Sequence, residues 1–95
     1  MIKSFADAIT EDVFHGIHTH EIRKKLTSQL LKKAELRLDL LNCAEDLESL
    51  RKIPSIKGEA AVRDAHGKHS IPINQEWRLA FGWNDGPEKV ELKSF

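Results

Sequence analysis

Six polar side chains, most of them cationic, gather within a short part of the chain, and their types suit the cleavage of RNA without a metal. They are Arg63, Asp64, His66, Lys68, His69 and Arg78. Such cleavage needs a base for the 2′-hydroxyl proton, cations that stabilise the charge on the phosphorane, and an acid for the leaving oxygen. Histidine suits the proton transfers and arginine suits the charge stabilisation. The alternative interpretation of these residues is an ordinary polar surface of a sheet.

Two runs of alternating polarity predict a β-hairpin that would position several of these residues. The runs cover residues 70–73 and 77–83, and a polar link at 74–76 joins them. Because side chains alternate between the faces of a strand, Trp77, Leu79 and Phe81 share one face with Trp83. Arg78 then points the opposite way. We expect the tryptophan side to carry the core, and several of the polar residues to meet on one face.

Helical patterns fill the N-terminal half of the chain. Asp7 can cap a short helix that Gly16 ends, and Thr19 can cap a longer helix that begins near His20. Along the longer helix an apolar stripe recurs at steps of three and four, formed by Ile22, Leu26, Leu30, Ala34, Leu38 and Leu41. A second stripe, formed by Leu36, Leu40, Cys43 and Leu47, predicts that another helix or a partner covers this helix on a second side.

The remaining elements define the fold class. Residues 2–5 alternate and predict a first strand, a break within residues 42–45 precedes a short helix with Leu50 inward, and a last strand begins near Val90. The sequence therefore predicts a single domain over residues 1–95 of the α+β class, with N-terminal helices packed on one face of an antiparallel sheet. Residues 63–67 read as a turn that leads into the hairpin.

Charge is balanced overall but sorted along the chain. The sequence has 15 Lys and Arg residues and 15 Asp and Glu residues, which argues against a nucleic-acid binder that relies on bulk charge. A basic group nevertheless lies in the helical region, formed by Arg23, Lys24, Lys25, Lys32, Lys33 and Arg37. It predicts a solvated helix face, or alternatively a surface for RNA or a partner.

Composition also bears on the compartment and on metals. A single cysteine, Cys43, excludes an intramolecular disulfide, and no apolar run approaches the length of a membrane span, so we expect a cytoplasmic protein without a membrane partner. His15, His18 and His20 have no fixed acidic or thiol companion, so they predict loop histidines rather than a metal site. No cofactor is expected.

The sequence resembles the HigB branch of the RelE-superfamily toxins, the plasmid-maintenance killer proteins. Residues 1–5, 67–71, 73–78, 81–83, 85–87 and 90–92 follow the pattern of that family. The resemblance implies a RelE-like fold and the toxin of a type II toxin–antitoxin system. It implies a metal-independent mRNA endonuclease that acts on the ribosome and is neutralised by a helix-turn-helix antitoxin of the HigA type.

The resemblance also implies roles for individual residues. Arg78 would hold the scissile phosphate, His69 and His66 would be the candidates for proton transfer, and Arg63 and Lys68 would contact phosphate. Asp64 matches the aspartate of the family's Lys-Gly-Asp-Arg stretch.

The end of the chain departs from the family and keeps an alternative open. Phe95 stands where the family has a tyrosine, and the terminal histidine that follows it in the family is absent. The alternative is a catalytically decayed, non-enzymatic binding module that retains contacts with the antitoxin or the ribosome. A third interpretation is a dimerising α+β domain of unrelated role.

Overall fold

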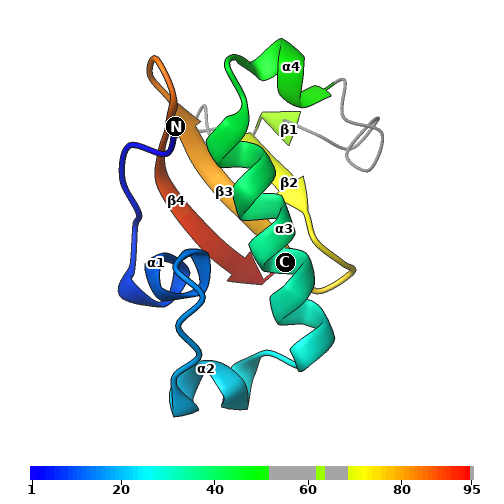
Figure 1. Cartoon of the computed structure of the whole chain (residues 1–95). Coiled ribbons are helices and arrows are strands. Elements are labelled where there is room, and N and C mark those ends of the chain that lie inside the picture. Colours follow the sequence, from blue (N-terminus) through cyan, green and yellow to red (C-terminus); the bar gives the residue numbers. More distant parts are fainter. Residues whose placement is uncertain (52–61, 64–68, 95) are drawn as a thin grey trace.

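Helices pack on one face of an antiparallel sheet in the computed structural model, which describes residues 1–51, 62–63 and 69–94 (Figure 1). The helices are α1 (Ala8–Phe14), α2 (His20–Lys25), α3 (Ser28–Cys43) and α4 (Leu47–Arg51). The strands are β1 (Val62–Arg63), β2 (His69–Pro72), β3 (Trp77–Trp83) and β4 (Pro87–Ser94). The predicted α+β class is confirmed.

The described strands follow one another across the sheet in the order of the sequence, β1-β2-β3-β4, and each pair is antiparallel. Leu79 lies opposite Ile71 on one side and Leu92 on the other, which sets one apolar row across the sheet. The register between β3 and β4 shifts between Ala80 and Gly82, where Lys89 adopts a positive φ of 51°. β4 therefore starts earlier than the predicted Val90, because this bulge interrupts the alternation that marks a strand.

The prediction of one long helix from His20 onward is wrong, because the backbone leaves the helical conformation between α2 and α3. Leu26 is extended, with φ −126° and ψ 128°, and the Thr27 hydroxyl accepts a hydrogen bond of 3.1 Å from the Leu30 amide. That cap starts a new helix although the apolar stripe runs through the break. The caps predicted at Asp7 and Thr19 are confirmed by hydrogen bonds to the amides of Thr10 and Ile22.

The core lies between α3 and the sheet. Leu38 and Leu41 of α3 are fully buried, as are Leu79 and Phe81 of β3. The whole predicted stripe is buried and belongs to one cluster with these strand residues, formed by Ile22, Leu26, Leu30, Ala34, Leu38 and Leu41. Trp77 and Trp83 are partly buried against the same cluster, so the predicted inward face of the hairpin is confirmed.

Replacing Leu79 with alanine is expected to lower the free energy of unfolding by roughly 2–5 kcal/mol, because it leaves a cavity at the centre of the core. Leu79 has no exposed surface, and it lies opposite Ile71 on β2 and Leu92 on β4. Denaturant titration monitored by tryptophan fluorescence measures the change. The control is Leu36→Ala, because Leu36 is 54% exposed. The free energy of unfolding of this variant should lie within about 0.5 kcal/mol of the wild-type value.

The N-terminal segment runs parallel to β4 and covers its edge (Figure 1). Phe5 forms an isolated bridge with Val90, and the Lys3 amide donates to the Pro87 carbonyl at 2.8 Å. The Ala6 amide donates to the Val90 carbonyl at 2.9 Å, and the Val90 amide donates to the Ser4 carbonyl at 3.1 Å. The predicted first strand is thus reduced to one bridge and three ladder bonds.

The second apolar stripe is only partly covered by the described elements. Leu36 is 54% exposed, Cys43 is exposed, and Leu40 is partly buried against the core. The predicted α4 exists, and its Leu50 is fully buried. None of the described helices is long and apolar enough to cross a membrane.

Candidate nucleic-acid interface

The face of the sheet that points away from the helices carries the outward residues of β2, β3 and β4. Arg78 lies between Pro72 on β2 and Lys93 on β4, and Ala80 lies between Ser70 and Glu91. Residues directly opposite each other in an antiparallel pair point to the same side, so these residues share one face. Because Leu79 and Phe81 point into the core, Arg78 and Ala80 must point outward. We call this surface the open face.

Two cations stand side by side on the open face. Arg78 and Lys93 are partners in the register, and each residue is half-buried. An anion placed over both side chains would be attracted by two positive charges. A guanidinium offers a planar fork of donors that matches the geometry of phosphate, and the ammonium adds a second positive charge.

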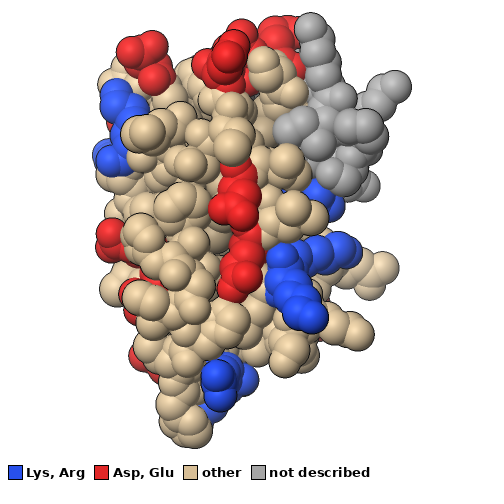
Figure 2. Space-filling model, in the orientation of Figure 1, with Lys and Arg blue, Asp and Glu red and all other residues tan. Residues whose placement is uncertain are grey.

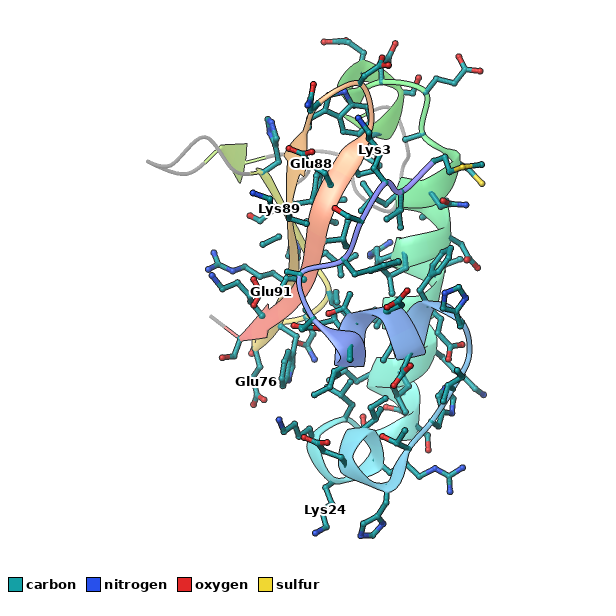
Figure 3. The ribbon with its side chains drawn as sticks, turned by 90° about the vertical axis from the view of Figure 1, so that its left-hand side faces the viewer. Lys3, Lys24, Glu76, Glu88, Lys89 and Glu91 are labelled. Carbon is teal, nitrogen blue, oxygen red and sulfur yellow. The ribbon has the colours of Figure 1, made fainter. Side chains whose placement is uncertain are left out.

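Two carboxylates continue the open face beyond the cations. Glu91 is diagonal to Arg78, a separation of roughly 7–8 Å that long side chains can bridge. Glu88 lies over Gly82, where a Cβ would come within 3.4 Å of Glu88 Cγ. Figure 3 views the sheet from the β4 edge and shows Glu91 and Glu88 on the side away from α3. The open face therefore changes from positive near Pro72 to negative near Gly82.

His69 lies on the other face of the sheet, so it does not meet Arg78. It pairs with Phe81 in the register, and the two rings stack with centroids 5.8 Å apart and planes 28° apart. Its Nδ1 atom is buried and has no hydrogen-bond partner among the described residues. The expectation that the hairpin's polar residues share one face is therefore wrong for His69, because the alternation that buries Ile71 also turns His69 inward.

If the chain cleaves mRNA, as the resemblance implies, replacing His69 with phenylalanine is expected to leave that cleavage within a few-fold of the wild type. Phenylalanine retains the ring contact with Phe81 and removes the buried nitrogen that lacks a partner. The expected free energy of unfolding is equal to or higher than that of the wild type. His69→Ala serves as the comparison, because it removes the ring and should lower stability. A loss of cleavage in His69→Phe without a loss of stability would restore a chemical role to this imidazole.

The other predicted site residues lie at or beyond the limits of the described structure. Arg63 is part of β1 rather than the predicted turn, and its backbone pairs with His69. Asp64, His66 and Lys68 lie outside the described residues. Their roles stay predictions from the resemblance.

Two residues of the open face, Lys93 and Glu91, were not among the predicted site residues. The alternation of the last strand, with Val90 and Leu92 inward, already pointed them outward. The alternation does not predict which residues of β3 lie opposite Lys93 and Glu91. The bulge at Lys89 sets that register, and it brings Lys93 beside Arg78.

The described residues contain no group of three His, Cys, Asp or Glu side chains placed to hold a metal ion. His18 instead contacts the Glu35 carboxylate through Nε2 at 2.5 Å, which ties the segment before α2 to α3. No protein-family model matches the chain, and no curated protein matches it either. The functional argument therefore rests on the open face and on the residues around it.

Proposed function

We propose that this chain is a toxin of the HigB type with a RelE-like fold, and that it cleaves mRNA on the ribosome at the open face. The observation that carries the proposal is the pairing of Arg78 with Lys93 on a face that the described helices leave uncovered. Two adjacent cations are donors of the kind that bind phosphate. The resemblance of the sequence around Arg78 to these toxins names RNA as the source of that phosphate.

Glu91 supplies the proton acceptor that the reaction requires. In the proposed step, the Glu91 carboxylate takes the proton of a 2′-hydroxyl, and the 2′-oxygen then attacks the adjacent phosphorus. Arg78 and Lys93 stabilise the added negative charge on the phosphorane. The bond to the 5′-oxygen breaks, and that oxygen takes a proton from the Lys93 ammonium. The products are a 2′,3′-cyclic phosphate and a 5′-hydroxyl, so no metal or oxidant is needed.

The partner of this toxin would be a helix-turn-helix antitoxin of the HigA type. The exposed Leu36 and Cys43 of α3, with the partly buried Leu40 between them, offer apolar surface for such a protein. A stable complex buries on the order of 1,200–2,000 Å² in total, which is more than this stripe alone provides. Both proteins would act in the cytoplasm, where the ribosome and the mRNA are.

Induced expression in a bacterial host tests the proposal, with growth and transcript cleavage followed in the same cultures. Purified protein is then mixed with a defined mRNA, either alone or bound to ribosomes. The proposal requires cleavage of the ribosome-bound mRNA and little cleavage of the free mRNA. It also requires a cyclic phosphate at the new 3′ end, which resists ligation until a phosphatase that opens cyclic phosphates removes it.

The alternative function is a binding module that has lost catalysis, and one observation favours it. The described part of the open face carries no imidazole, because His69 points to the helices. A module of this kind would bind ribosomes or an antitoxin without slowing growth. Ribosome co-sedimentation without transcript cleavage would select this alternative.

A further inference from the structure

Arg37 of α3 is buried, although its place among the basic helix residues predicted a solvated side chain. Only 9% of its surface is exposed, whereas Arg23, Lys32 and Lys33 are exposed. Its Nε atom is buried without a hydrogen-bond partner, and no described residue forms an ion pair with it. A buried N–H group that lacks an acceptor is unfavourable, and an anion bound beside it would supply one. The described part of the fold supplies neither.

Arg37 lines a cleft of about 310 Å³ between α3 and the turn that joins β2 to β3. The cleft is bounded by Lys33, Arg37, Pro72, Ile73, Asn74 and Gln75, and none of these residues is acidic. Lys33 precedes Arg37 by one helical turn, so two like charges stand next to each other on the same side of α3. Figure 2 shows Lys and Arg side chains gathered beside the lower half of α3, where this turn passes.

In the turn, the side-chain oxygen of Asn74 is already engaged by the backbone. The Asn74 side-chain oxygen accepts two backbone hydrogen bonds of 2.8 Å, from the amides of Glu76 and Trp77. These bonds fix the orientation of the amide group, so the end that remains available is the Nδ2 group with its two hydrogens. The cleft therefore combines two cations with an oriented neutral donor.

From this arrangement we infer that the cleft between α3 and the β2–β3 turn binds a phosphate group. Arg37 and Lys33 neutralise its charge, and Asn74 donates to a further oxygen. Phosphate fits better than a carboxylate, because the donors come from two elements and can reach more than two oxygens. The site lies on the α3 side of the sheet, whereas Arg78 points away from α3, and Pro72 borders both surfaces. The inference does not depend on RNA cleavage.

The phosphate can come from a free phosphate or nucleotide, or from the backbone of RNA. Thermal unfolding and calorimetric titration distinguish these sources with three probes: orthophosphate, adenosine monophosphate and a six-nucleotide RNA with a 5′-hydroxyl, all at one ionic strength set with chloride. We expect orthophosphate to raise the melting temperature of the full chain and to bind at one site. Tighter binding of the RNA than of the mononucleotide would assign the site to the backbone, and the reverse order would assign it to a small ligand.

The variants Arg37→Met and Lys33→Met test the residues, with Arg23→Met and Lys32→Met as matched controls of the same charge change on exposed positions. We expect Arg37→Met to weaken phosphate binding at least tenfold and to raise the melting temperature in phosphate-free buffer, because it removes a buried N–H group that lacks an acceptor. Lys33→Met should weaken binding without that rise. The inference is overturned if orthophosphate leaves the wild type unchanged, or if it stabilises Arg37→Met as much as the wild type.

Discussion

Replacing Arg78 with alanine is expected to reduce the rate of mRNA cleavage by about 10²–10³, the usual effect of removing one preorganised donor to a developing anion. Arg78 is half-buried near the start of β3, so its position is set by the strand and by its neighbours Pro72 and Lys93. The measurement is the single-turnover rate on ribosome-bound mRNA, read together with growth after induction. Both cleavage and growth arrest should fall together.

Two control variants separate the role of the Arg78 guanidinium from the effect of removing any positive charge. Arg78→Lys keeps the charge and loses the planar fork, so its rate should lie between those of the wild type and Arg78→Ala. Lys24→Ala removes an exposed cation from α2, and it should cleave at the wild-type rate. If the Arg78→Ala protein is folded and still arrests growth fully, the open face is not where cleavage occurs.

Replacing Glu91 with glutamine should reduce cleavage by about 10²–10⁴, the range attributed to a positioned proton acceptor, while RNA binding is retained. Glutamine keeps the size of the side chain and removes its ability to accept the 2′-hydroxyl proton. Removal of a negative charge beside Arg78 and Lys93 should also tighten RNA binding slightly. Fluorescence anisotropy with a non-cleavable 2′-deoxy substrate measures binding separately from the rate.

Glu88→Gln is the matched control for Glu91→Gln. Glu88 lies on the same face with the same charge, but it sits over Gly82 and farther from Arg78 along the strands. Equal loss of rate in the two variants would mean that the general charge of the face matters and that Glu91 has no specific role. A loss confined to Glu91→Gln supports the proton transfer.

Local patterns predicted much of the fold, because they depend on neighbours in the sequence. The alternation of Trp77, Leu79 and Phe81 gave the inward face, and the hydroxyl and carboxylate caps at Thr19 and Asp7 gave two helix starts. The break at Thr27 was missed because Leu26 stays in the apolar stripe although its backbone is extended. A stripe at three- and four-residue steps does not reveal whether one helix or two carry it.

The site was less predictable, because it depends on how strands align. Arg78 was placed outward correctly, but its neighbour Lys93 follows from a register that a single bulged residue, Lys89, determines. The inward position of His69 follows from the sequence, because His69 and Ile71 are two positions apart and share one face of a strand. The burial of Arg37 could not be predicted from the sequence, since it depends on where the turn at Asn74 packs against α3.

The coverage of β4 by the N-terminal segment constrains the order in which the protein can fold during synthesis. Phe5 bridges Val90, and the Leu92 amide donates to the Thr10 hydroxyl at 2.9 Å, so these early residues are held by residues that follow them by 82 positions or more. Contacts so distant in sequence slow folding. While the chain is still on its own ribosome, before β4 has emerged, α1 lacks the strand it packs on and β3 keeps a bare edge. The open face therefore cannot be assembled until translation through β4 is complete, which would delay any action of this protein on the ribosome that makes it.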